Sequence, residues 1–360
     1  MAVHLPIGHG AILNELRELA GREEPPHALL FAGPEGVGRT YLALQYALLL
    51  NCDGGEPAPA GATLFGDEPP APAGRPCGEC RSCRLMLAGG HPDVVELVPG
   101  DTLCKPRQGE GGHGSHADSR DIRICQVRGL VELAARYPVE ARTRAVIIEP
   151  AERLGRDAAH AMLKTLEEPP GHSVFLLVSS APASIIETIR SRCRRIDVPL
   201  VPRDEIEKGL LGRGVDAAIA GRAASEARGR PAKAVTFADQ PDLMDDRERF
   251  LQRCAKIAAS SIAERLDYVE DLADRWRRDR RAVHVELDAW ETFWETRLHD
   301  GAHRADEDLQ QVVRALRAVG QAREDLLAQV QARPALELML LTFPRTTLEE
   351  THEELASANG

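Results

Sequence analysis

No stretch of the sequence is apolar for long enough to cross a membrane. The longest nearly apolar run, Tyr41 to Leu50, is far shorter than the roughly 20 residues that a membrane-spanning helix needs. The first residues, MAVHLPIGHGAIL, also lack the basic segment followed by a continuous apolar segment that marks a secretory signal. We therefore expect a soluble cytoplasmic protein with no membrane contact.

The chain also lacks an excess of positive charge. It has 45 lysines and arginines against 56 acidic residues, a net charge of −11. A strong autonomous DNA-binding protein usually carries a broad positive field, so any DNA contact is expected to be local or shared with partner chains. Its 360 residues, 43% of them hydrophobic, can bury a sizeable core divided over two or three domains.

A disulfide framework is not expected either. The chain has eight cysteines, but a cytoplasmic protein is kept in a reducing environment, where a tight cysteine cluster favours metal binding. Four cysteines are widely spread, and we expect them to be small buried hydrophobes: Cys104, Cys125, Cys193 and Cys254.

The other four cysteines have the spacing of a zinc site. Cys77, Cys80 and Cys83 form a C-x-x-C-x-x-C run, and Cys52 precedes them, just after a predicted helix. Four thiolates in a tetrahedron suit Zn²⁺ and leave no open position for water or substrate, so such a site is structural. Redox chemistry is the alternative for a C-x-x-C motif, and His91 is a less favoured substitute ligand.

A glycine loop stands between a predicted strand and a predicted helix. Residues 27–32 form a short apolar run typical of a buried strand, and residues 41–50 are strong helix formers. The segment between them, GPEGVGRT, fits the phosphate-loop pattern except that arginine occupies the lysine position. Backbone N–H groups of such a loop hold phosphate oxygens. The predicted nucleotide ligands in the loop are Gly33, Gly36, Gly38, Arg39 and Thr40.

The same loop lacks features that ATP hydrolysis needs. The guanidinium of Arg39 is planar and broad, so it is not a neutral replacement for the compact lysine ammonium beside the β- and γ-phosphates. A second strand is predicted to end at Glu149, which can face a magnesium ion, but Pro150 stands where the water-orienting glutamate is expected. We predict no intrinsic ATPase, and whether the site binds ATP stays open.

The pattern of elements predicts three domains. Strands at 27–32, 144–149 and 173–180 alternate with helices at 11–20, 122–136 and 155–168, which is typical of a parallel α/β sheet. The expected boundaries are residues 1–199 for this domain, 200–245 for a small helical lid, 246–345 for an all-helical domain and 346–360 for a frayed tail. The Pro- and Gly-rich segments 53–76 and 105–119 are expected to be loop insertions.

Several segments together resemble one family, the clamp-loader subunits of bacterial DNA polymerase III, which are AAA+-type proteins. The resemblance is close over residues 4–200, weak over the lid, and limited to length and helical character beyond it. Its segments occur in the family's order: HALLFAGPEGVGRT, the cysteine insertion after the phosphate-loop helix, GHPDVVELVP, AVIIEPAERL, AMLKTLEEPP and SRCRRIDVPL.

The resemblance implies a role within a larger assembly. In this family the gamma/tau subunits hydrolyse ATP, whereas delta-prime subunits are similar in fold but usually have a degenerate site, and Arg39 and Pro150 resemble the delta-prime type. The segment Ser191-Arg192-Cys193 is similar to the family's arginine-finger motif, so Arg192 is expected to act in trans on ATP held by a neighbouring gamma subunit. A purely local ion pair is the alternative for this arginine.

The same resemblance implies the partners of the chain. A delta-prime subunit is a structural stator, a non-catalytic subunit of the DNA polymerase III holoenzyme, which works with gamma/tau and delta to load the sliding clamp onto primed DNA. Residues 229–234 are weakly similar to the family's sensor-2 segment, and 246–345 would be the collar that joins the subunits. The alternatives are a gamma-type ATP-hydrolysing motor and a stand-alone zinc-stabilised nucleotide switch.

Overall fold

The computed structural model describes residues 7–54, 76–100, 103–104, 119–304, 309–328 and 330–345. The chain divides into two compact units, residues 1–238 and residues 239–360. The finer division into three domains stays a prediction. Most of the two expected insertions and the expected frayed tail lie outside the described residues.

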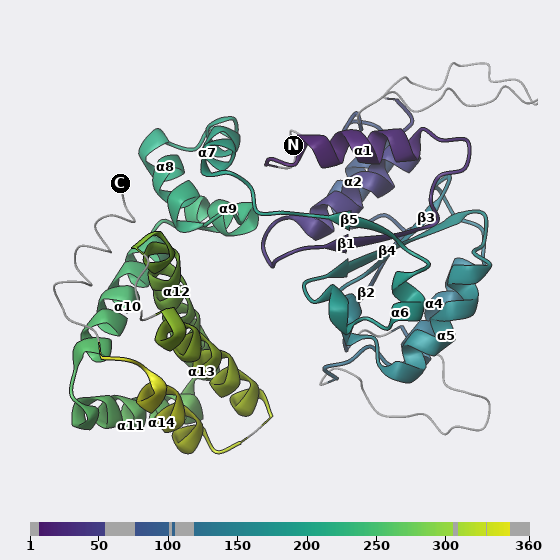
Figure 1. Ribbon diagram of the computed structural model, residues 1–360. Coiled ribbons are helices and arrows are strands. Elements are labelled where there is room, and N and C mark those ends of the chain that lie inside the picture. The colour runs from purple at the N-terminus through teal and green to yellow at the C-terminus, as the bar shows by residue number, and fades with distance from the viewer. Residues whose placement is uncertain are drawn as a thin grey trace, which may run out of the picture. The chain divides into compact units, whose positions relative to one another are not determined.

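The first unit contains all the described strands (Figure 1). Its β/α part consists of α1 (Gly10–Ala20), β1 (Ala28–Ala32), α2 (Arg39–Asn51), α3 (Arg81–Leu87), β2 (Val94–Leu97), α4 (Ile124–Ala134), β3 (Arg144–Ile148), α5 (Arg156–Glu167), β4 (Ser173–Ser179), α6 (Glu187–Arg190) and β5 (Arg194–Asp197), with short 3₁₀ turns η1 (Ala151–Arg153) and η2 (Pro182–Ser184). Three further helices follow: α7 (Arg203–Leu211), α8 (Ala217–Glu226) and α9 (Pro231–Asp239).

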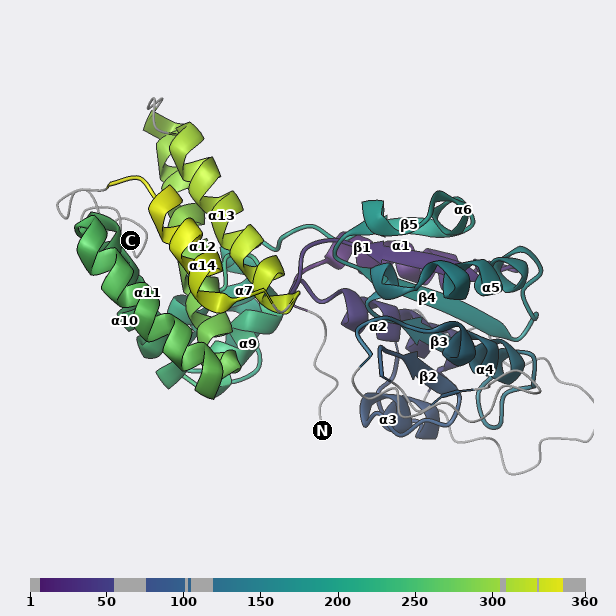
Figure 2. The same cartoon turned by 90° about the horizontal axis from the view of Figure 1, so that it is seen from below.

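The five strands form one parallel sheet in the order β2-β3-β4-β1-β5. Helices α1, α2 and α3 cover one face, and α4, α5 and α6 cover the other (Figure 2). Strand residues alternate between the two cores: Leu29 and Phe31 of β1 join the α1–α3 side, and Ala28 and Leu30 join the α4–α6 side. A strand buried on both faces needs apolar residues at every position, which explains the continuous run ALLFA.

The second unit is a helical bundle of α10 (Asp242–Ala259), α11 (Ile262–Arg278), α12 (Arg280–Arg304), α13 (Leu309–Leu327) and α14 (Ala332–Thr342). Trp290 and Trp294 on α12 are fully buried in its core. The guanidinium of Arg265, 4% exposed, donates to the carbonyl oxygens of Ala258, Leu340, Phe343 and Pro344, so it satisfies backbone acceptors at two helix ends.

The fold class predicted from the sequence is confirmed. The structure contains a parallel α/β domain with a strand, glycine loop and helix in succession, followed by helices. Strands β2 and β5 were not predicted, because each has only four residues. In addition, β5 is an edge strand that contains two exposed arginines, so it lacks the continuous apolar run of a central strand. None of the helices in the described ranges is long and apolar enough to cross a membrane.

A buried ion pair ties the start of β2 to the start of β3. Asp93 is fully buried, and its carboxylate accepts hydrogen bonds from the backbone N–H groups of Val139, Glu140 and Ala141 at 2.7–3.0 Å. Arg144 donates to the same carboxylate at 2.9 Å. Burial by itself would raise the pKa of Asp93, but these donors outweigh it and lower the pKa from 3.8 to about 2.

Replacing Asp93 with alanine is expected to destabilise the chain by about 3–5 kcal/mol, because it leaves a buried guanidinium without its charge partner. Denaturant unfolding measures the loss. Asp197, whose pair with Arg195 is exposed, is the matched control, and its replacement with alanine should cost no more than about 1 kcal/mol. Because the folded pKa of Asp93 lies below the unfolded value, its contribution is present above about pH 4 and is lost as the pH falls towards 2. Equal losses for both variants would contradict this role of Asp93.

Candidate functional site: the phosphate loop, the cysteine cluster and Arg192

The glycine loop joins β1 to α2, as the sequence predicts. A side chain at Gly33 has no room, because a Cβ there would lie 2.1 Å from the carbonyl oxygen of Val198. Gly38 caps α2 with φ 97°, a conformation that favours glycine. Gly33 therefore lets the loop pass close to the residue that follows β5. Gly38 lets α2 begin directly after the loop, so that the first N–H groups of the helix are available to bind an anion.

Arg39, at the lysine position of the loop, is buried. It is 8% exposed, and its Nη1 makes no hydrogen bond within the described part of the chain. A buried guanidinium nitrogen without a partner is costly, so the position suits an anion. The arginine substitution therefore leaves positive charge in the loop, although not in the compact form that lysine provides.

Thr40 and Glu149 meet beside the loop. The hydroxyl of Thr40, in the first turn of α2, donates to Glu149 Oε2 at 2.6 Å, and Glu149 directly follows β3. In phosphate-loop proteins a Ser or Thr hydroxyl and an aspartate hold a magnesium ion beside the nucleotide, and Glu149 offers a carboxylate in place of that aspartate. Thr40 and Glu149, which the sequence assigned separately to the nucleotide site, thus lie in contact, and their chemistry fits that ion.

The position for a water-orienting glutamate is occupied by Pro150. The nearest following carboxylate, Glu152, accepts hydrogen bonds from the backbone N–H of Ser180 at 3.1 Å and from its hydroxyl at 2.7 Å. Burial would raise the pKa of Glu152, but its hydrogen bonds outweigh this and lower it. Oε1 of Glu152 is therefore held at the end of β4, whereas its Oε2 is buried and makes no hydrogen bond within the described part of the chain.

An apolar pocket of about 340 Å³ lies next to the loop within the first unit. It is lined by Ile7, Val37, Tyr41, Pro231, Ala232 and Val235, with His9 and Arg213 among its polar residues. No sequence pattern predicted this pocket, because its walls come from segments nearly 200 residues apart. The one sequence feature that touches the pocket is the segment 229–234, which is weakly similar to the family's sensor-2 segment. Helix α9 begins within this segment and supplies one wall of the pocket.

Helix α9 is also anchored to the loop itself. The backbone N–H of Ala232 donates to the carbonyl oxygen of Gly36 at 3.0 Å. The side-chain stems of Arg230 and Lys233 pass so close to Gly36 that a Cβ there would lie 3.3 Å and 3.7 Å from them. Two basic side chains at the start of α9 thus lie against the phosphate loop.

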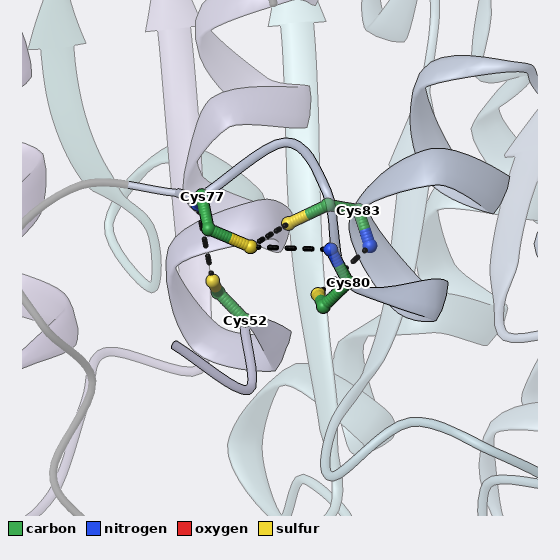
Figure 3. A group of neighbouring side chains, drawn as sticks. All are labelled: Cys52, Cys77, Cys80 and Cys83. Carbon is green, nitrogen blue, oxygen red and sulfur yellow. Dashed lines mark hydrogen bonds between the residues drawn. The ribbon is translucent and has the colours of Figure 1, made fainter. Parts of the chain in front are cut away.

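The four predicted metal ligands gather in one place (Figure 3). Cys52 follows α2, Cys77 lies on the incoming loop, and Cys80 and Cys83 belong to the start of α3. Their sulfur atoms all lie within 4.8 Å of one another, and the Cys77 and Cys83 sulfurs are 4.0 Å apart. A zinc tetrahedron with Zn–S distances of about 2.3 Å has S–S edges of about 3.8 Å, so the cluster could bind a metal such as zinc.

Backbone donors and burial set the charge state of the cluster. The N–H groups of Cys77, Cys80 and Cys83 donate to neighbouring sulfurs at 3.3–3.4 Å. Burial would raise the pKa of Cys77, but such bonds outweigh it and lower the pKa to about 7. Burial and the neighbouring cysteines raise the pKa of Cys83. A proton therefore stays in the free cluster, and a metal ion must displace it.

Arg192 lies just after α6. Its guanidinium donates to the carbonyl oxygen of Thr188 at 2.8 Å and pairs with the carboxylate of Glu167. The side chain remains 34% exposed. A local ion pair, the alternative interpretation of this arginine, is thus present, and the role of Arg192 towards another chain stays a prediction.

Comparison with known proteins decides the family. The model of the family described as "DNA polymerase III, delta subunit" matches residues 8–201, more than half of the chain. The chain belongs to the delta-prime family of DNA polymerase III subunits.

Two curated relatives and one solved structure show the extent of the likeness. A DNA polymerase III subunit delta' of Pseudomonas aeruginosa is 37% identical over 183 residues, 51% of this chain and 46% of the relative. The tau subunit of Bacillus subtilis is 30% identical over 211 residues, 59% of this chain and 31% of the relative. A gamma subunit-related protein of Thermotoga maritima is 16% identical with a TM-score of 0.44, covering 92% and 98% of the two chains. The match to each of these curated relatives spans less than half of that relative's length.

Proposed function

We propose that the chain acts as the delta-prime subunit of a clamp loader and does not hydrolyse ATP itself. The observation that carries the proposal is that Pro150, which has no carboxylate, directly follows Glu149 at the position of the water-orienting glutamate. The next carboxylate along the chain, Glu152, is held through its Oε1 by Ser180. Without a carboxylate to orient water, a bound nucleotide would stay intact. The delta-prime family membership supports the same conclusion.

The catalytic contribution of the chain would be Arg192, offered to ATP on a neighbouring gamma subunit. Its ion pair with Glu167 is exposed on both sides, 34% and 48%, and such pairs are worth no more than about 1 kcal/mol. Releasing Arg192 towards a phosphate group would therefore cost little. The proposed partners are gamma/tau and delta, and the sliding clamp and primed DNA are engaged through the complex.

The cysteine cluster would hold a structural zinc ion. All four ligands are cysteines, which closes the coordination shell and leaves no place for substrate. The metal would join α3 and the preceding loop to the end of α2. The ion would have no part in nucleotide chemistry.

The second candidate function is an ATP-hydrolysing motor. Three observations favour it over a subunit that binds no nucleotide at all. Arg39 keeps a buried nitrogen without a hydrogen bond among the described residues, Thr40 and Glu149 lie together, and an apolar pocket adjoins them. These features would suit bound nucleotide.

Phosphate release by the purified chain separates the two candidates. The proposed function predicts no turnover above background, together with co-elution of the chain with gamma and delta in size-exclusion chromatography. Turnover by the chain alone would identify a motor instead, and failure to associate with gamma and delta would rule out a clamp-loader subunit.

A further inference from the structure

The junction of α11 and α12 carries a dense group of arginines in a chain that is acidic overall. Residues 275–281 read RWRRDRR, whereas the whole chain has a net charge of −11. Three of these arginines, Arg278, Arg280 and Arg281, are all exposed and form the arginine cluster. Such a local concentration of charge is the form of nucleic-acid contact that an acidic chain can offer.

The acids nearest to this junction have other partners. Arg275 pairs with Glu286 at 2.5 Å, Arg277 pairs with Asp274 at 2.8 Å, and Asp279 accepts the backbone N–H of Ala282 at 3.0 Å. The arginine cluster itself has no carboxylate within 4.0 Å in the part of the chain that the structure describes. Three positive charges therefore face solvent without a direct ion-pair partner.

Helix stability does not account for two of these arginines. Arg278 lies in the last turn of α11, where a cation interacts favourably with the helix dipole. Arg280 and Arg281 lie in the first turn of α12, where the same dipole disfavours cations. A role outside the chain gives a physical reason for their presence.

An aromatic ring lies among the arginines. The guanidinium of Arg280 lies over the ring of Trp276, 5.4 Å from its centroid, and Trp276 is partly exposed at the edge of the helical core. His284 meets the same ring edge-on, with centroids 5.3 Å apart. Bases of single-stranded nucleic acid stack on aromatic rings and guanidinium planes while arginines hold the backbone phosphates.

We propose that the arginine cluster and Trp276 form a contact site for single-stranded nucleic acid. Arg278 and Arg281 would bind backbone phosphates, and a base would lie against the Trp276–Arg280 stack. An acidic peptide would meet the same charges but has no base to place there, so nucleic acid is favoured. The inference concerns the helical unit alone and does not depend on the role of Arg192.

Tryptophan fluorescence of the unmodified full chain gives the first test. The other two tryptophans, Trp290 and Trp294, are fully buried, so quenching by a bound base reports on Trp276. Titration with oligo(dT) at low salt is expected to quench this emission. The slope of log K against log salt is expected to be about −1.4, corresponding to the two phosphate contacts of Arg278 and Arg281 at about −0.7 each.

Substitution of two arginines tests the site directly. Arg280→Gln/Arg281→Gln should weaken oligo(dT) binding about 5- to 10-fold and make the salt slope shallower by about 0.7, because only Arg281 of the two contacts a phosphate. The thermal midpoint should be unchanged or slightly higher. The matched control is Arg314→Gln/Arg317→Gln on α13, which removes two exposed arginines from the same helical unit. It should leave binding unchanged.

Three results would overturn the proposal. One is an equal loss of affinity for the two double variants, which would mean that only net charge matters. Another is tight binding of poly-glutamate with no tryptophan quenching by oligo(dT), which would point to an acidic protein partner. The third is a fall in the thermal midpoint of Arg280→Gln/Arg281→Gln with unchanged binding, which would assign the cluster to folding.

Discussion

Replacing Arg192 with alanine is expected to slow ATP hydrolysis at one gamma site of an assembled clamp loader by roughly 10³-fold or more. The reason is that an arginine finger stabilises the charge that develops on the transferred phosphoryl group, and alanine offers no charge in its place. Phosphate release by the complex with gamma, delta and primed DNA measures the effect. The total rate of ATP hydrolysis by the complex should fall by at least the fraction that this one gamma site contributes.

Glu167 supplies the matched control for this experiment. In the isolated chain Arg192 pairs with Glu167, so Glu167→Gln frees the arginine without removing it. We expect turnover in the complex to be retained or slightly raised with this variant. Unchanged turnover with Arg192→Ala, or equal losses with both variants, would mean that Arg192 serves only the local ion pair.

Removing metal from the cysteine cluster is expected to destabilise the first unit strongly. Cys52 and Cys83 belong to the core on the α1–α3 side of the sheet, so loss of the metal would leave buried thiols and the start of α3 without their common anchor. We expect Cys80→Ser, or chelation during unfolding, to lower stability by several kcal/mol and the thermal midpoint by roughly 10 °C or more.

Metal content and the thermal midpoint are measured together for this prediction. Cys104 is exposed, so the expectation that it is a buried hydrophobe was wrong, and it lies outside the cluster. Cys104→Ser is therefore the control, and it should keep one zinc per chain and the wild-type midpoint. Full stability of metal-free protein, or protein prepared without chelators that contains no zinc, would exclude a structural zinc site.

The parts of the site that could be predicted from the sequence are those held together by local segments. Gly33 to Thr40 are contiguous, so the strand, loop and helix around them follow from propensity and glycine positions alone. The cysteines could be grouped because three of them have fixed short spacing, and the structure brings Cys52 to them as predicted. The sequence assigned Thr40 and Glu149 to the same nucleotide site, but it did not predict the hydrogen bond between them.

The parts that could not be predicted depend on contacts between distant segments. No pattern connects His9 with Arg213, and only the folded first unit places both at the pocket beside the loop. The role of Asp93 was equally hidden, because its partners are backbone groups of residues 139–141 and Arg144, which a sequence motif does not reveal. The free charges of Arg280 and Arg281 likewise depend on the folded partners of the neighbouring acids, which no spacing rule specifies.

A clamp-loading assay tests the proposed delta-prime function most directly. The amount of sliding clamp placed on primed circular DNA is measured with gamma and delta in the presence and absence of this chain, with ATP. We predict that loading requires the chain, although the chain hydrolyses no ATP by itself. Loading that proceeds equally well without the chain would contradict its assignment as a delta-prime subunit.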